Sequence, residues 1–230
     1  VWFFYHVAKT GGQTIRNHLS AALGPSAHLH LGRWDPDDEP VGAEVLADRD
    51  LEDVRVVTGH RVVRSLMPAF SPRPVNDVLV LRHPGDRIVS HWRHNNHRRG
   101  LQGREPLTFD EFSTSRGTEP MVREVARRIP GERRRRRMLD AALHALTTVR
   151  FVTVVEDLDL VLPRLLEAMG LPGEVPPRAN RAGIDYPADD PPDGAEVAAW
   201  VARNPGDLVL YRAARERTAS TLRLLAGSGP

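Results

Sequence analysis

The 230-residue chain contains no cysteine and only one lysine. Without a thiol it cannot form a disulfide scaffold, a thiolate zinc site, an iron–sulfur cluster or a cysteine nucleophile. It also lacks any run of 18 apolar residues, so no membrane-spanning helix is predicted. No secretory signal pattern is evident. These absences favour a cytoplasmic protein that folds through its hydrophobic core.

The charges of the chain nearly balance, with 32 basic and 30 acidic residues and a net charge of +2. This excess is too small to indicate a general nucleic-acid-binding protein. Every basic residue except Lys9 is an arginine. An ammonium is a compact point charge that a planar guanidinium does not replace, so Lys9 is a candidate functional residue.

Apolar strand-like runs alternate with helical patterns along the sequence. We expect strands at 2–7, 54–58, 78–81 and 151–155, and helices at 13–23, 84–99, 158–169 and 207–225. This alternation predicts an α/β fold in a single P-loop-like domain over residues 1–230, with a central, mostly parallel sheet flanked by helices. Residues 61–74 are expected to be irregular, residues 100–120 a mobile segment with short helices, and residues 172–192 a proline-rich surface linker.

The first candidate motif joins the first strand to the first helix and reads Lys9-Thr10-Gly11-Gly12-Gln13-Thr14. A glycine pair lets the backbone wrap closely around an anion, and the following helix presents free N–H groups to it. Lys9 adds a full charge and Thr14 a hydroxyl, so the motif predicts a phosphate-type site. It is not a Walker A loop, in which the lysine follows the glycines. An ordinary tight turn with a surface lysine is the alternative.

The second motif runs from Arg82, at the end of the third predicted strand, into the helix that carries Ser90. Ligands of parallel sheets bind at that edge, and an arginine fork with a hydroxyl could hold a second phosphate. Arg87, Ser90, His91 and His94 share one helix face by their spacing. The alternative is a structural ion pair for Arg82. We expect His91 and His94 on a solvated helix face rather than in an acceptor pocket.

Together the two motifs resemble the sulfotransferases that use 3′-phosphoadenosine 5′-phosphosulfate (PAPS). The likeness is strongest to the Lys-Thr-Gly-Gly branch, which includes carbohydrate 2-O-sulfotransferases and many bacterial relatives. Gln13 and His83 depart from the family pattern, which usually has Thr or Ser and an acidic residue or Asn at these positions. The remaining similarities, in chain order, are Thr58-Gly59-His60, Glu156-Asp157-Leu158-Asp159, Asn180-Arg181 and Asp207-Leu208-Val209-Leu210-Tyr211.

The resemblance implies a bacterial PAPS-dependent sulfotransferase, active in natural-product biosynthesis or on carbohydrates, that needs no metal and releases adenosine 3′,5′-bisphosphate. Its partner would be a small-molecule or carbohydrate acceptor rather than nucleic acid or membrane. Lys9 would stabilise the leaving phosphate, and His60 would be the general base. The cofactor-binding residues implied are Lys9, Thr10, Gly11, Gly12, Gln13, Thr14, Arg82, Ser90 and Arg181.

Histidine is the side chain whose pKa suits proton abstraction near neutral pH, and His60 ends a predicted strand at the same sheet edge as Lys9. A structural histidine bonded to a backbone carbonyl is the alternative. His6 lies in the first predicted strand with no preferred side.

Two other functions stay open. A P-loop kinase would need a Gly-Lys-Ser or Gly-Lys-Thr loop end and an acidic metal ligand, neither of which is evident. A non-catalytic polyanion-binding protein would use Arg133–Arg137, although a solvated helix face is the simpler interpretation of that run. The sequence does not determine the acceptor or the oligomeric state.

Overall fold

Five parallel strands form the centre of the computed structural model, which describes residues 1–32, 43–130, 138–174 and 191–227. The sheet order is β2-β3-β1-β4-β5, and each neighbouring pair runs parallel. The predicted α/β fold with a parallel sheet is therefore confirmed. Only β2, which has three residues, was absent from the sequence prediction, because so short a run carries no readable period. The strands are β1 (Trp2–Tyr5), β2 (His28–His30), β3 (Val56–Gly59), β4 (Asn76–Leu81) and β5 (Phe151–Val154).

The four predicted helices are confirmed as α1, α2, α6 and α8, and four further helices fill the regions between them. Residues 64–70, expected to be irregular, form the 3₁₀ helix η2 (Arg64–Phe70), and η1 (Ala43–Leu46) and η3 (Val155–Asp157) are shorter turns. No helix within the described ranges is both long and apolar enough to cross a bilayer. The helices are α1 (Gly12–Ala27), α2 (Pro84–Leu101), α3 (Phe109–Ser115), α4 (Pro120–Arg128), α5 (Met138–Thr148), α6 (Leu158–Ala168), α7 (Gly194–Arg203) and α8 (Pro205–Ala226).

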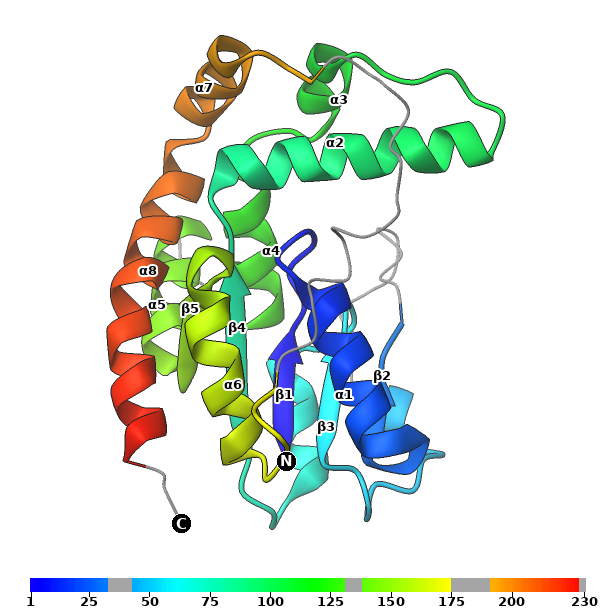
Figure 1. Cartoon of the computed structure of the whole chain (residues 1–230), viewed down its shortest axis with the longest axis vertical. Helices are drawn as coiled ribbons and strands as arrows, with labels where there is room; N and C mark the ends of the chain where they lie inside the picture. The colour runs from blue at the N-terminus through cyan, green and yellow to red at the C-terminus, as the bar shows by residue number, and fades with distance from the viewer. Residues whose placement is uncertain (33–42, 131–137, 175–190, 228–230) are drawn as a thin grey trace.

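Helices cover both faces of the sheet because alternate side chains of each buried strand point to opposite faces. Phe4 packs with Ile15 of α1 and Leu165 of α6 in one apolar cluster. Phe3 packs on the other face, in a cluster that includes Val125 of α4. Figure 1 shows α1 and α6 on the viewer's side of the sheet, with α4 and α5 behind it. The strands thus lie in a dry layer, and their carboxyl ends are fixed relative to one another.

A third apolar cluster lies beyond the carboxyl ends of the strands. Figure 1 shows α2 running across those ends, with α3 and α7 on its outer side. Ile88 and Trp92 of α2 pack there against Phe109 and Phe112 of α3 and Trp200 of α7. This cluster holds α2 in place, so that the opposite face of the helix can be directed toward the strand ends.

Residues 100–120, expected to be a mobile segment with short helices, contain the short helix α3, and the stretch between α2 and α3 is held by hydrogen bonds. Asn96 is buried, and its side chain both donates to the Leu107 carbonyl (2.8 Å) and accepts from the Leu107 N–H (3.0 Å). Trp92 Nε1 donates to the same carbonyl (2.8 Å). Composition suggested freedom here, but these long-range hydrogen bonds were not readable from the sequence.

Helices α4 and α8 cap each other. The N–H groups of Met121 and Val122 in α4 donate to the buried carboxylate of Asp207 (3.1 and 2.8 Å). In return, the N–H groups of Gly206 and Asp207 in α8 donate to the carboxylate of Glu119, just before α4 (2.8 and 2.6 Å). Each carboxylate satisfies N–H groups that a helix start leaves without partners. The pair fixes the position of α4 against the rest of the molecule.

We expect Asp207→Ala to lower the free energy of unfolding by about 2 kcal/mol, because two buried N–H groups lose their acceptor. The exposed cap Asp193 of α7, which accepts from Glu196 N–H, is the matched control. Its change to Ala should cost about 1 kcal/mol. Urea unfolding measures both variants, and an Asp207→Ala cost no larger than the control would contradict the buried cap.

The same comparison has a defined pH dependence. Burial raises the pKa of Asp207 from 3.8 to about 6. A carboxyl group whose pKa is higher in the folded state loses its contribution to stability as pH rises through that value. The stability gap between the wild type and Asp207→Ala should therefore be wider at pH 4 than at pH 8, which urea unfolding at the two values tests.

Candidate functional site

A cavity of about 1170 Å³ lies at the carboxyl end of the sheet. The chain leaves β1 toward β2 on one side and leaves the neighbouring β4 toward β5 on the other, and such a reversal opens a crevice at the strand ends. Lys9 follows β1 and Arg82 follows β4, and both line this cavity. The two sequence motifs, more than 70 residues apart, thus meet in one space.

The loop after β1 presents backbone amides to the cavity. Lys9 and Gly11 both adopt the left-handed conformation, with φ of 69° and 81°. Helix α1 then begins at Gly12 with no side-chain cap and no acidic residue in its first turn. The Thr14 N–H already donates to the Gly11 carbonyl (3.1 Å), so the N–H groups of Gly12 and Gln13 are the ones at this helix start that favour an anion. Gly12 and Thr14 line the cavity, as the anion-site prediction requires.

Two other side chains of this motif contact their own segment. The buried Thr10 donates its hydroxyl to the Val7 carbonyl (2.8 Å), which closes the turn of the loop. Gln13 lines the cavity and donates through Nε2 to Asn17 Oδ1 (2.7 Å), one helical turn away. The Thr10 hydroxyl thus shapes the loop, whereas Gln13 borders the cavity.

Lys9 is partly desolvated and lies within electrostatic reach of the like charge of Arg82. Burial and then the positive charge of Arg82 lower the pKa of the Lys9 ammonium to about 8. Within the described part of the chain Arg82 makes no ion pair. The alternative interpretation, that this arginine serves a structural ion pair, is therefore not supported by those residues. Two like charges that repel in a partly dry space are stabilised when an anion binds between them.

The face of α2 turned to the cavity carries Arg87, Ser90, His91 and His94, all of which line it. The spacing argument for a shared face is confirmed. The expectation that His91 lies on a solvated face is wrong: it packs edge-on against Phe112, with ring centroids 5.2 Å apart. Burial, with nearby cations, lowers the pKa of His91 to about 3, so its imidazole is neutral at physiological pH.

His60 follows β3 and lies parallel to His6, with ring centroids 4.0 Å apart and planes inclined by 20°. Both rings line the cavity. A Cβ atom at Gly12 would lie 2.2 Å from the His6 ring, so glycine is required there for the ring to fit. The strand position alone did not show to which side the His6 ring points. In the structure the ring packs against His60 and against the start of α1.

Burial lowers the pKa of His60, and burial with the nearby His60 lowers the pKa of His6 to about 3. Both rings are therefore neutral near pH 7. The backbone of His6 partly offsets the effect of burial and raises the pKa of His60. Imidazole has two ring nitrogens, so one can hold the ring in place while the other accepts a proton.

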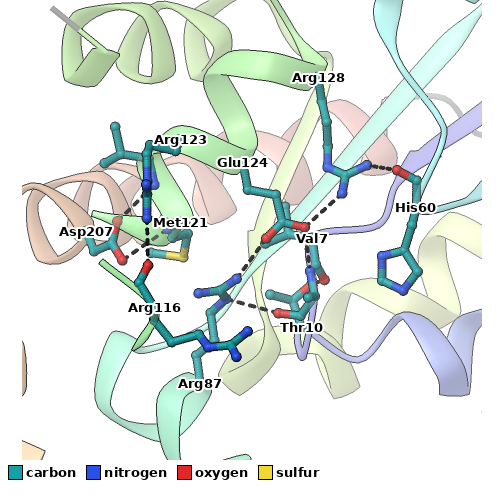
Figure 2. A network of polar contacts seen from close by, with 12 residues as sticks. Val7, Thr10, His60, Arg87, Arg116, Met121, Arg123, Glu124, Arg128 and Asp207 are labelled. Carbon is teal, nitrogen blue, oxygen red and sulfur yellow. Dashed lines mark hydrogen bonds and ion pairs between the residues drawn. The ribbon is translucent and has the colours of Figure 1, made fainter. Parts of the chain in front are cut away.

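Glu124 of α4 is the site residue that sequence analysis missed. Its carboxylate lines the cavity and accepts from the Ala8 N–H (2.9 Å). It also accepts from Arg87 Nη2 (2.7 Å) and Arg128 Nη2 (2.8 Å), as Figure 2 shows. Burial alone raises the pKa of Glu124, but Arg128 and Arg87 outweigh it and lower the pKa to about 2. The i,i+4 spacing to Arg128 was readable, whereas the contact with Arg87 was not.

The cavity is strongly cationic. Arg116 stacks on Phe112, with the guanidinium carbon 4.5 Å from the ring centre, and Arg123 donates to the Arg116 carbonyl (2.7 Å). Of the described residues, two carboxylates line the cavity, Asp86 and Glu124. Eight cationic side chains line it: Lys9, Arg82, Arg87, Arg93, Arg116, Arg123, Arg127 and Arg128. Such a lining gives the cavity a positive electrostatic potential, which attracts anions.

Arg181, the neighbouring Asn180, the run Arg133–Arg137 and most of the predicted linker over residues 172–192 lie outside the described residues. The cofactor role of Arg181 and the polyanion-binding role of the arginine run therefore stay predictions.

The depressed pKa of Lys9 can be measured directly, because this is the one lysine in the chain. In protein labelled with ¹³C-lysine, we expect a single side-chain signal that titrates near pH 8. Arg82→Gln removes a repelling charge and should raise this pKa toward its ordinary value of 10.5. The exposed Arg164→Gln is the control and should leave it unchanged. A wild-type Lys9 signal that titrates at the ordinary value would contradict the desolvation of Lys9 beside Arg82.

Comparison with known proteins adds no identification. No model of a known protein family matches the chain, and no curated protein is significantly similar to it. The function is therefore inferred from the cavity and from the motifs that line it.

Proposed function

We propose that the protein is a sulfotransferase that moves the sulfuryl group of PAPS to a hydroxyl or amine of a small-molecule or carbohydrate acceptor. One observation carries the proposal: Lys9, the start of α1, Arg82 and Ser90 line a single cavity together with the neutral imidazole of His60. This combination provides two anion-binding groups and a proton acceptor in one space. The cytoplasmic, bacterial setting implied by the sequence resemblance belongs to the same proposal.

The residues present fit a donor with two phosphate-type ends. The loop at Lys9 and the amides at the start of α1 would hold the 5′-phosphosulfate, through charge and helix-terminus N–H groups. Arg82 and Ser90 would hold the 3′-phosphate, with the arginine fork giving preference over adenosine nucleotides that lack it. The bound donor supplies an activated sulfuryl group. In its absence the cavity holds a surplus of positive charge.

Lys9 has the electrostatic role in the transfer. A bond forms between the acceptor oxygen and sulfur while the bond from sulfur to the 5′-phosphate oxygen breaks, and adenosine 3′,5′-bisphosphate leaves. Negative charge grows on that phosphate as the bond breaks. A fixed ammonium and fixed amides stabilise this charge with little reorganisation. Lys9 is well suited because its loop geometry is set before the donor binds.

His60 takes the proton that the acceptor hydroxyl loses. Its pKa is lowered by burial, so the ring is ready to accept a proton at neutral pH. Stacking on His6 restricts the orientation of the ring. A general base contributes only when its lone pair is aimed at the reacting group, and this arrangement restricts that direction.

Four cationic side chains are left over after the donor and the Glu124 contacts are assigned: Arg93, Arg116, Arg123 and Arg127. They come from α2, from the end of α3 and from α4. The proposal therefore includes an acceptor that itself carries an anionic group. Matched acceptors, such as an aryl glucoside and the corresponding glucuronide, offered with PAPS should favour the glucuronide in kcat/KM.

Calorimetry separates the proposal from a magnesium-dependent kinase. Adenosine 3′,5′-bisphosphate should bind the wild type without magnesium, and removal of the 3′-phosphate should weaken binding at least tenfold. The same weakening is expected for Arg82→Gln, because the fork that recognises this phosphate is lost. ATP binding that requires magnesium, with no binding of the bisphosphate, would support the kinase and overturn the sulfotransferase.

We expect Lys9→Ala to lower the rate of bisphosphate release from PAPS by about 10²–10³-fold, as loss of a preorganised charge typically does. Lys9→Arg retains the charge but not its shape and should recover only part of the rate. The release assay measures both, with Arg164→Gln as the control on an exposed helix position. Near-normal turnover of Lys9→Ala would remove the lysine from the mechanism.

The His60→Ala variant should bind adenosine 3′,5′-bisphosphate within threefold of the wild type yet lose transfer to an alcohol by at least 10²-fold. His144→Ala in α5 removes a histidine outside the cavity lining and is the control. Should His60→Ala keep its activity across pH 6–8, another group is the base.

A further inference from the structure

Three separate segments of the site converge on the carboxylate of Glu124, as Figure 2 shows. The loop that carries Lys9 reaches it through the Ala8 N–H (2.9 Å). Helix α2 reaches it through Arg87 Nη2 (2.7 Å). The strand end that carries His60 is connected through Arg128, which bonds Glu124 with one nitrogen (2.8 Å) and the His60 carbonyl with another.

The peptide groups around Ala8 are held on two sides. The Ala8 N–H donates to Glu124, and the Ala8 carbonyl accepts from Arg87 Nε (3.0 Å). The next residue, Lys9, adopts a left-handed conformation with φ of 69°, which is unfavourable for a side chain with a Cβ. The contacts from Glu124 and Arg87 thus restrain the backbone where Lys9 departs from the usual conformations.

The cluster around Glu124 is nearly dry. The side chains of Arg87 and Arg128 are 4% and 5% exposed, and that of Glu124 is 19% exposed. Without the carboxylate, two buried guanidinium groups would face each other with no counter-charge, which is a large electrostatic penalty. The carboxylate cannot move away easily either, because the mutual caps with α8 hold the start of α4.

We propose that Glu124 is a positioning residue that sets the placement of Lys9 relative to His60 across the cavity. It acts through Ala8 on one side and through Arg128 and the His60 carbonyl on the other. This inference rests on the proposed function, in which Lys9 and His60 act on opposite ends of the same transfer. It assigns a role to a side chain that neither contacts the reacting atoms nor belongs to either sequence motif.

The charge of Glu124 also acts on His60, and this effect distinguishes positioning from simple structural support. Burial lowers the pKa of His60, Glu124 raises it, Arg128 lowers it, the hydrogen bond to the His6 backbone raises it, and His30 of β2 lowers it. Loss of the carboxylate charge therefore lowers the pKa of His60. If transfer requires neutral His60, the acid limb of the pH–rate profile, where activity falls as His60 is protonated, should then move to lower pH.

The test is Glu124→Gln, which keeps the shape and an acceptor for the Ala8 N–H but removes the charge. We expect kcat for PAPS-dependent transfer to fall at least tenfold, because the alignment of Lys9 with His60 is lost. Bisphosphate affinity should stay within threefold, because the cavity loses a negative charge and becomes more cationic. The acid limb of the kcat–pH profile should move to lower pH. An unchanged kcat and acid limb in a folded variant would overturn the proposal.

Two further variants control for folding and for charge. Glu124→Asp keeps the charge but shortens the reach, so it should retain the wild-type acid limb while losing part of kcat. Glu216→Gln on an exposed position of α8 makes the same charge change outside the cavity and should alter neither quantity. If Glu124→Gln does not fold, the Asp variant decides: full wild-type kcat despite the shorter side chain would refute positioning.

A measurement without turnover separates this inference from the proposed function. Histidine side-chain NMR signals followed against pH report the His60 titration directly, with His60→Ala used to assign the signal. Glu124→Gln should lower that pKa whether or not the wild type uses PAPS, and no change would refute the effect of Glu124 on His60. If Glu124→Gln lowers the His60 pKa as expected but the wild type neither binds the bisphosphate nor transfers sulfate, the proposed sulfotransferase function alone is refuted.

Discussion

The ion-paired carboxylate of Glu124 is the interaction on which the geometry of the site depends. It neutralises two guanidinium groups that α2 and α4 bring into the same dry space, and it accepts the backbone N–H that precedes Lys9. A buried charge pair of this kind gives little net stability, because desolvation offsets the attraction. Its value lies in geometry, since removal of any member leaves an uncompensated charge.

The rest of the fold supplies what that cluster needs. Mutual caps between α4 and α8 place Glu124, and the apolar cluster beyond the strand ends presses α2 into position with Arg87 directed inward. The parallel sheet then brings the loop after β1 and the ends of β3 and β4 to one edge. Apolar packing thus sets the distances, and polar contacts set the directions of the functional groups.

Burial, reinforced by neighbouring positive groups, explains the shifted pKa values around the cavity. Lys9, His6 and His91 all have their pKa values lowered by burial and by nearby positive groups. Each shift means that the protonated form is disfavoured in the free protein. In the proposed function, a polyanionic donor would compensate these charges, so the same electrostatics would contribute to its affinity.

The sequence by itself was enough for the parallel α/β fold, four of the helices and the two motifs that line the cavity. Strand and helix periods are local properties, and parallel strands necessarily gather their carboxyl ends at one edge. It could not show that Arg87 pairs with a carboxylate 37 residues away, or that this carboxylate bonds a peptide 116 residues from it. No local period encodes such contacts.

The histidines show the same division between what local sequence predicts and what only tertiary packing decides. His60 was recognisable as a candidate base from its place after a strand, but the ring stacked against it, His6, had no preferred side in a strand read alone. His91 was expected in solvent because its helix face is polar, yet α3 packs Phe112 beside it. Chain composition determined which chemical groups are available. Only tertiary packing decided which of them are desolvated and share one cavity, because burial and charge proximity arise between segments that are distant in the chain.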